Sequence, residues 1–425
     1  MTPNTPQNRY TLRTPLQRLS ALLALCASPL LHAQSAPQEA EPTWHFSGFG
    51  TLGAGYHGTD GVQVRRDLDQ ARGYEGDKLG FRADTRLGVQ ATARFGPAWG
   101  VTVQGLSRLS RDNDWAPEVT WAFIRHSPTD WLDLRVGRLG VDIYPSGDSR
   151  HVGYAFTAAR PAPEVYGMAT DDRFDGADVT LSQPVGSGIA SFKVYGGRGR
   201  GGYYLYGQSL ANESPVTVGA NAQWSSEALT LKAAWGSTYT AKDPSLQPLA
   251  NALRQVPAVV SPMAGVRAAE IGISHHVNFA SLGLLYDQGP LTVESTLGWE
   301  RFTAFPRYEG WAGTVLAAWR IGAWKPYVGY ARNRFTPDDK PLALPALNPQ
   351  LVMLQSVYDR VVDRLRIDQR TVTLGARYDF GGNYALKFQI DHTDAAASTL
   401  FLDRAGMPVS DVSTTLYSVV LDFVF

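Results

Sequence analysis

The chain ends in LYSVVLDFVF (residues 416–425), where apolar side chains alternate with a more polar set. Successive side chains of an extended strand point to opposite faces, so Tyr417, Val419, Leu421, Phe423 and Phe425 share one face. The same period of two recurs along the chain, without a helical layer to cover the apolar face. A sheet of this kind is stable as a closed barrel in a bilayer. We therefore predict an all-β, transmembrane antiparallel barrel.

The alternating segments predict sixteen strands, of which DTRLGVQATARF (84–95) is the clearest. We expect them at 44–56, 84–95, 99–108, 118–126, 132–138, 174–182, 189–197, 216–224, 229–237, 277–286, 291–300, 311–320, 324–331, 370–379, 384–391 and 413–425. Most are close to the ~9–11 residues with which a tilted strand crosses the hydrocarbon layer.

The connections between these strands alternate between short and long. Short turns are expected at 96–98, around 127–128, and at 183–188, 225–228, 287–290, 321–323 and 381–382. The loops are expected at 57–83, 109–117, 139–173, 198–215, 238–276, 301–310, 332–369 and 392–412. An even-stranded barrel with both termini on the turn side gives this alternation, with periplasmic turns and extracellular loops.

Tryptophan positions support the membrane assignment. Trp44, Trp99, Trp131, Trp224, Trp319 and Trp324 fall at turn-side strand ends, and Trp235, Trp299 and Trp311 at loop-side ends. Aromatic girdles at the two interfaces of a barrel have this distribution, whereas core aromatics are expected in mid-strand.

The amino terminus resembles a cleaved export signal. Arg9, Arg13 and Arg18 precede an apolar run at 21–31, and Ala33 offers a cleavage point. The run is shorter than the ~20 residues of a spanning helix. A lipoprotein acceptor at Cys26 is the alternative, which the preceding Leu25 disfavours. We expect a signal peptide at 1–33 and a barrel domain at 34–425, located in the outer membrane.

Charge and cysteine content argue against several classes of protein. Removing residues 1–33 leaves 36 Lys and Arg (39 minus three) against 39 Asp and Glu, a net charge near −3, and removes the single cysteine. No disulfide is then available, and a near-neutral chain without a basic block argues against a nucleic-acid partner. We expect no cofactor. We also expect no metal, because adjacent strand residues such as His275 and His276 face opposite ways.

The inner face of the predicted barrel is polar and charged, and sixteen strands enclose a lumen too wide for side chains to fill. The loop at 139–173 is longer than its span requires, and we expect it to fold inward and narrow this lumen. Opposite charges across a narrow gap would then sort solutes by charge. The candidate lining residues are Arg86, Gln90, Gln104, Arg108 and Arg135 on strands, and Asp142, Asp148, Glu164, Asp171 and Asp172 in the loop. Alternatively, the loop acids pair locally with Arg150, Arg160 and Arg173.

Short motifs resemble those of the Gram-negative outer-membrane porins. They are FSGFGTLGAGY (46–56), LRVGRLG (134–140), DRFDGADVTL (172–181) and the terminal Phe425. The resemblance implies passive diffusion of ions and small hydrophilic solutes, often through a homotrimer. It also implies contact with outer-membrane lipid and lipopolysaccharide, and Phe425 as an insertion signal for the barrel-assembly machinery.

Three other functions remain as alternatives. A substrate-selective channel for sugars or anions is one. Tyr203, Tyr204 and Tyr206 could supply the row of aromatic rings along which sugars move in such channels. A barrel-embedded enzyme is less favoured, because His126 and His392 lack an evident Ser/Asp constellation. A plugged transporter would need a large amino-terminal domain. The GxGxxG pattern at 48–53 lies inside a predicted strand, so we attribute its glycines to close strand packing rather than to a dinucleotide site.

Overall fold

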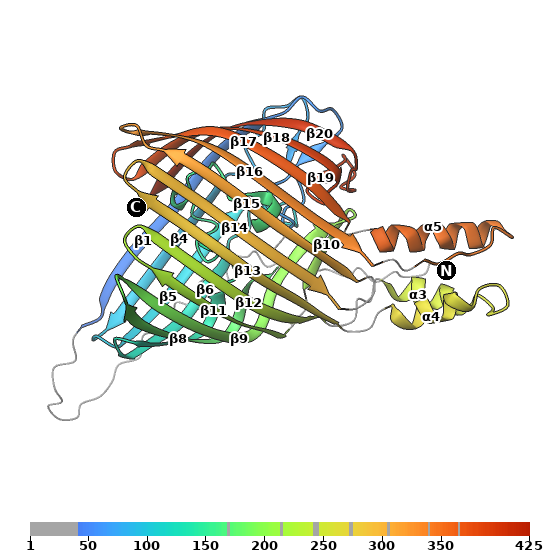
Figure 1. Ribbon diagram of the computed structural model, residues 1–425, viewed down its shortest axis with the longest axis horizontal. Coiled ribbons are helices and arrows are strands. Elements are labelled where there is room, and N and C mark those ends of the chain that lie inside the picture. Colours follow the sequence, from blue (N-terminus) through green and yellow to red (C-terminus); the bar gives the residue numbers. More distant parts are fainter. Residues whose placement is uncertain are drawn as a thin grey trace, which may run out of the picture. The chain divides into compact units, whose positions relative to one another are not determined.

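Sixteen long antiparallel strands close into one barrel (Figure 1). The computed structural model describes residues 41–167, 171–212, 216–240, 246–271, 275–303, 307–338, 341–363 and 366–425. The barrel belongs to a unit that begins at Pro42. The predicted signal segment, 1–33, lies outside the described residues.

All sixteen predicted strands are present, and several are longer than expected. They are β1 (Thr43–Tyr56), β4 (Arg86–Phe95), β5 (Trp99–Arg108), β6 (Glu118–Thr129), β7 (Leu132–Gly140), β8 (Asp171–Val185), β9 (Gly188–Leu205), β11 (Val216–Ser225), β12 (Leu229–Thr240), β13 (His275–Gln288), β14 (Leu291–Phe302), β15 (Tyr308–Trp319), β16 (Trp324–Pro337), β17 (Ile367–Phe380), β18 (Tyr384–Ala397) and β20 (Val412–Val424). Each pairs with its sequence neighbour, and β1 pairs with both β4 and β20.

The two faces of the barrel wall have the expected polarity. Outward positions such as Leu87, Val89 and Phe46 are exposed, whereas Arg86 on the inner face is buried. Girdle residues including Trp44, Trp99, Trp319, Trp235 and Trp311 are also exposed. The apolar outer face is therefore available to the bilayer, as the alternating pattern predicts.

The loops contain short elements of their own. These are β2 (Gln63–Val64), β3 (Tyr74–Glu75), β10 (Gln208–Asn212), β19 (Phe401–Leu402), the 3-10 helix η2 (Gly153–Ala155), α2 (Pro163–Tyr166), α3 (Gln247–Arg254), α4 (Pro262–Glu270) and α5 (Pro349–Asp363). β19, β2 and β3 form a small separate sheet, while β10 pairs with the end of β9. Among the described helices, none is long and apolar enough to cross a membrane.

Two predicted loops prove to be partly helical. α3 and α4 lie in 238–276 and α5 lies in 332–369, and they extend beyond one end of the barrel (Figure 1). Leu249, Leu253, Ala268 and Tyr358 are part of their shared core. The loop predicted at 198–215 is also wrong in part, because β9 continues to Leu205 and forms a ribbon with β10. Hydrogen-bonded ribbons continue past the membrane, where the apolar alternation that marks a spanning strand is no longer required.

The barrel closes at a seam where β1 pairs with β20, and the glycines of β1 lie along this seam. Gly48 and Phe425 exchange two backbone hydrogen bonds, with N–O distances of 2.8 and 3.0 Å. A Cβ on Gly48 would lie 2.3 Å from the Phe425 ring, and one on Gly50 would lie 2.2 Å from the Phe423 ring. These rings end an aromatic row, with consecutive centroids 4.7–6.5 Å apart, that runs from Trp324 through Tyr378, Phe380 and Tyr384.

We predict that Gly48→Val weakens barrel closure, because the new side chain displaces the Phe425 ring from the seam. Overpacking of this kind costs about 1–3 kcal/mol, so the yield of refolded, heat-modifiable barrel should fall. Gly105→Ala in β5 is the matched control, since a Cβ there meets no atom closer than 3.9 Å. Equal yields for Gly48→Val and the wild type would contradict this account of the seam.

Candidate functional site

Loop 3, defined here as residues 141–167, folds into the barrel and follows its inner wall. At its start, Ser281 of β13 donates a hydrogen bond to the Ile143 carbonyl. Further along, Thr157 donates to Glu294 of β14 at 2.6 Å, and Arg86 of β4 donates to the His151 carbonyl at 2.7 Å. These bonds reach opposite parts of the wall, so the inward fold predicted for this loop is confirmed.

Loop 3 is attached to the wall by buried cations. Arg160 of the loop donates to Asp84 and to Asp391 of β18, both at 2.7 Å. Lys387 of β18 lies 2.7–3.0 Å from the carbonyls of Gly153, Phe156 and Ala158. Its ammonium also lies 2.8 Å from Asp422 of β20. Removing one partner of a buried pair leaves an uncompensated charge, so these contacts specify the loop's position strongly.

The first acidic residue of loop 3 is also an anchor. Asp142 contacts the ammonium groups of Lys193 on β9, at 2.6 Å, and Lys232 on β12. Asn221 on β11 donates to the same carboxylate at 3.2 Å. Burial opposes ionisation, but the two lysines outweigh it and lower the pKa of Asp142 to about 2. Asp142 is therefore an ionised carboxylate, and its contacts with the two lysines fix the start of the loop.

Glu164 has a different environment, although it is equally buried. Its Oε1 accepts hydrogen bonds from Thr371 and, at 2.7 Å, from Gln369, both on β17. No described residue bonds to its Oε2, and no cation neutralises it within the described part of the chain. Burial raises the pKa of Glu164 above its usual range. This carboxyl holds α2 against the wall, and it keeps its proton to a higher pH than an ordinary glutamate does.

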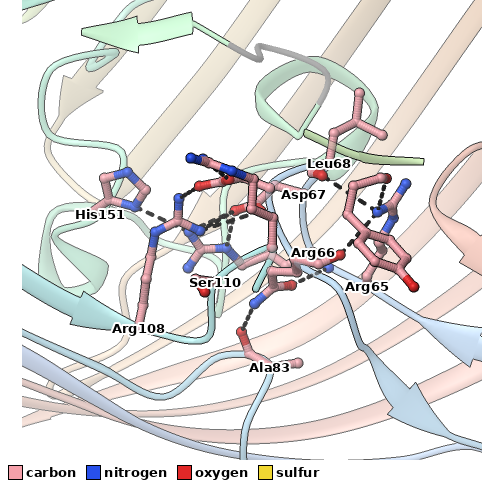
Figure 2. Close-up of polar contacts among 12 residues, drawn as sticks. Arg65, Arg66, Asp67, Leu68, Ala83, Arg108, Ser110 and His151 are labelled. Atoms are coloured by element: carbon pink, nitrogen blue, oxygen red, sulfur yellow. Dashed lines mark hydrogen bonds and ion pairs between the residues drawn. The ribbon is translucent and has the colours of Figure 1, made fainter. Parts of the chain in front are cut away.

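Loop 1, defined here as residues 57–85, also turns inward, which the sequence did not predict. Arg65 is fully buried, and it joins three loops through backbone carbonyls (Figure 2). It donates to Gln70 in loop 1 at 2.9 Å, to Tyr204 at the end of β9 at 2.7 Å, and to Thr399 before β19 at 3.0 Å. Burial lowers the pKa of Arg65 to about 10, which leaves it charged at neutral pH.

The next residues of loop 1 contact both loop 3 and the wall (Figure 2). Arg66 Nη2 lies 3.2 Å from His151 Nδ1 in loop 3 and 3.2 Å from Asp67. Asp67 contacts Arg108 of β5 at 3.4 Å, and Asp69 contacts Arg108 as well. Burial alone would raise the pKa of Asp67, but Arg108 and Arg66 outweigh it and hold the pKa below its usual range. Loop 1 thus brings its own acids to the wall arginine.

A recess lies between loop 3 and the wall formed by β5 and β6. Its lining includes Gln104, Thr120 and Trp121 on the wall, and Asp148 and Arg150 on the loop. Gln104 is held in a polar chain, since it donates to Gln90 at 3.0 Å and accepts from Thr120 at 2.8 Å. The recess thus has both polar and apolar lining, and bonds from neighbouring strands hold Gln104 in place on its wall side.

The wall arginines that were expected to oppose the loop 3 acids across the lumen have partners other than those acids. Arg86 bonds a loop carbonyl, Arg108 pairs with loop 1, and Arg135 of β7 pairs with Asp178 of β8, with an Nε–Oδ1 distance of 3.0 Å. Arg86 and Arg108 are buried rather than exposed to the lumen. The placement of an inward loop 1 could not be read from the strand pattern.

The remaining predicted residues have varied positions. Gln90 and Gln104 lie together on the wall, Asp148 is exposed, and Asp142 and Glu164 are buried anchors. Asp171 and Asp172 begin β8, but their side chains lie outside the described part. Of the arginines considered for local pairing within loop 3, Arg160 pairs with Asp84 and Asp391, and Arg173 pairs with Glu118 at 2.5 Å.

Sequence reasoning missed Arg65, Arg66 and Asp67, because loop 1 carried no strand or motif signal. It also missed the anchoring role of Arg160, although its partner Asp391 and the charged residues Lys387 and Asp422 were recognisable as inward-facing charges of spanning strands. Charges inside a barrel wall need partners, and this is the signal that could have indicated an inward cation. Of the histidine pair, His276 packs on Tyr239, while the His275 side chain lies outside the described part.

A closed sixteen-stranded barrel, apolar outside and polar inside, with an inward loop, is the architecture of an outer-membrane channel. The chain belongs to the Gram-negative porin family, whose model matches residues 19–423. It is therefore an outer-membrane porin, which forms a channel for diffusion of ions and small hydrophilic solutes. None of the curated proteins matches the sequence.

Solved structures share the fold at low identity. An OmpF of Salmonella typhi in complex with daunomycin is 12% identical, covers 90% of this chain and 97% of its own, and has a TM-score of 0.53. OmpT of Vibrio cholerae is 12% identical with 91% and 99% covered and a TM-score of 0.52. An anion-selective porin from Comamonas acidovorans is 14% identical with 91% and 100% covered and a TM-score of 0.50. At these identities the likeness concerns the fold alone.

We predict that Arg65→Met loosens the three loops that Arg65 joins, because backbone carbonyls in all three lose the Arg65 donor. An unsatisfied buried polar group costs about 1–3 kcal/mol. Amide hydrogen exchange should rise in 57–83, 199–207 and 398–411, while the barrel strands keep their protection. Arg404→Met, in the same loop region but exposed, is the control. Unchanged exchange in all three loops would show that Arg65 does not hold them.

We predict that Glu164→Gln gains stability relative to the wild type as pH rises from 4 to 7, because an amide cannot ionise whereas the buried carboxyl can. Since the folded pKa is raised, the wild type loses stability as pH rises from the ordinary Glu pKa towards the folded one. The gain in melting temperature should therefore be small near pH 4 and larger near pH 7. A gain that is independent of pH would exclude ionisation of Glu164 as its cause.

Proposed function

We propose that solutes cross this porin through the space between loop 3 and the wall formed by β5, β6 and β7. The observation that carries the proposal is the attachment of loop 3 to β4, β9, β17, β18 and the run from β11 to β14, by the bonds described above. These bonds hold loop 3 against the part of the wall that faces β5 and β6. The passage then runs between the loop and β5 to β7, beside the recess lined by Gln104 and Trp121. Loop 1 narrows the passage at its loop-side end, where Arg66 and Asp67 lie.

The charges that solutes meet differ from those that anchor the loops. Arg86, Arg108 and Asp142 are buried, so they shape the field without contacting solutes. Arg125 and Arg135, which are cross-strand partners on β6 and β7, keep 51% and 22% of their side chains exposed. Together with Asp148 on the loop, they are our candidates for selection by charge, which acts over about a Debye length, ~10 Å at moderate salt.

We infer that residues 1–33 are a cleaved signal and that Phe425, at the seam, serves as the insertion signal for barrel assembly. We propose no enzymatic activity, because the lumen residues act as anchors and lining.

A homotrimer is supported by the outer wall. The outward positions of β20, β1, β4 and β5 carry no charged residue in this fully described sector, and include the exposed Leu52, Tyr56, Leu87 and Val103. A second copy could cover this face. One Vibrio cholerae OmpT structure is described as a trimer form.

Single-channel recording tests the passage. We predict that replacing residues 145–158 by a short Gly-Ser linker raises conductance and admits larger neutral solutes, because the wall-bound loop is removed. Deleting 349–363 (α5), which lies beyond the barrel end, is the control and should leave conductance near the wild-type value. Equal effects of both deletions, or none from the first, would place the constriction elsewhere.

A further inference from the structure

The wall beside loop 3 carries two aromatic side chains on its inner face. Trp121 and Phe123 of β6 pair with Gln104 and Thr102 of β5, which are buried on the lumen side. The two ring centroids are 6.3 Å apart, and both side chains are only half-buried. Apolar groups that are exposed together beside water mark binding surfaces more often than isolated ones do. Contact with lipid does not explain this pair, because lipid lies on the other face of the wall.

A β-bulge in β6 lies directly beside Trp121. The register between β5 and β6 shifts between Gln104 and Gly105, so that Thr120 has no cross-strand partner. Adjacent residues of a regular strand point to opposite faces, yet Thr120 and Trp121 both line the recess beside loop 3. Thr120 donates a hydrogen bond to the Gln104 side chain at 2.8 Å, which holds the bulge in place. Bulges re-aim side chains next to functional sites.

Three arginines lie at one level of the barrel, on the turn side of these rings. Arg94 of β4 pairs with Gly100 of β5, and Gly100 pairs in turn with Arg125 of β6. Arg125 also pairs with Arg135 of β7. Cross-strand partners share a face, so all three arginines point into the lumen. Because Gly100 has no side chain, the space between Arg94 and Arg125, two strands or about 9–10 Å apart, stays open.

The row of arginines keeps positive charge and free donors. Arg125 pairs with Asp133 at 2.8 Å, and Arg135 pairs with Asp178. Arg94 is exposed and forms no ion pair with any residue that the structure describes. Each guanidinium has five N–H donors, and 51% of the Arg125 side chain is exposed. An anion in the lumen can therefore bind here without displacing an existing partner.

Short steps connect the rings to the arginines. The guanidinium carbon of Arg135 lies 5.2 Å from the centre of the Phe123 ring. Arg125 is two residues beyond Phe123, and two residues along a strand span about 6.6 Å. We call Trp121, Phe123, Arg135, Arg125 and Arg94 the aromatic–arginine track. It runs from the recess beside loop 3 towards the turn-side end of the barrel.

We propose that the aromatic–arginine track makes aromatic carboxylates a favoured class of solute, a proposal that rests on the passage proposed above. The flat ring of the solute stacks on Trp121. Its carboxylate then moves on to Arg125 and Arg94, which bind it through charge-assisted N–H donors. A small inorganic anion would use the arginines without the rings, and a neutral sugar would use the rings without the arginines. The contacts are non-covalent and follow one another, so the solute is released on the turn side.

Reversal potentials of the full mature barrel in planar bilayers at pH 7 test this proposal. Potassium chloride on one side faces potassium benzoate, cyclohexanecarboxylate or acetate on the other. Size alone predicts that benzoate is less permeant than acetate, whereas we expect the wild type to favour benzoate over both other carboxylates. Trp121→Leu removes the flat ring and should lower the benzoate-to-cyclohexanecarboxylate permeability ratio about two- to tenfold, the range of an aromatic contact. Trp121→Phe keeps a ring and should retain part of the preference.

The arginines are tested separately from the ring. R94Q/R125Q should lower the permeability of all three carboxylates relative to potassium, while the benzoate-to-cyclohexanecarboxylate ratio stays close to that of the wild type. R254Q/R360Q is the matched control, because it removes the same charge from α3 and α5 beyond the barrel end. Its reversal potentials should equal those of the wild type.

A wild type that favours acetate over benzoate, or an unchanged ratio in W121L, would overturn the aromatic preference and leave the passage in place. Wild-type reversal potentials in R94Q/R125Q would instead locate the passage elsewhere, and both proposals would fall. Should W121L give no heat-modifiable barrel, W121Q replaces it with the same expected loss of the ratio, and an unchanged ratio there refutes the proposal in the same way.

Discussion

Closure of the hydrogen-bonded sheet is the constraint on which the rest of this structure depends. Inside a bilayer an open strand edge would leave backbone groups without partners, so the first and last strands must meet. They meet at a seam where Gly48 and Gly50 give room for the rings of Phe425 and Phe423. The glycines of the first strand and the aromatic carboxyl terminus therefore pack against each other in the fold, although almost the whole chain separates them in the sequence.

Closure creates a second problem, because a wide polar lumen must be narrowed without a packed apolar core. Buried charged side chains hold the narrowing loops in place instead. Asp142, Arg160 and Lys387 attach loop 3 to the wall, and Arg65 joins three loops at the mouth. Each of these ions is buried, and its desolvation is offset by several partners at once. The result is a loop whose position is specified by direction-dependent contacts rather than by general apolar burial.

Glu164 is the exception among these anchors, since no described cation neutralises it. It is bonded by neutral side chains, and its raised pKa links the attachment of α2 to proton concentration. The outside of the barrel shows the complementary arrangement. Charges there, such as Arg334 and Arg370, pair with acids at the strand ends and stay exposed to solvent, so their desolvation cost is small.

The sequence by itself determined the barrel, the number of strands and the sorting of turns from loops, because period-two alternation is imposed directly by a wall with lipid on one side. It also identified loop 3 from its length, and the inward charges from strand parity. Only the tertiary structure decided which charges meet. Arg108 pairs with loop 1 and Arg135 with Asp178, because loops return to the lumen by routes that no local pattern encodes. The helices α3 to α5 were missed for a related reason: their shared core is assembled from two distant loops, and neither has a strand period to interpret.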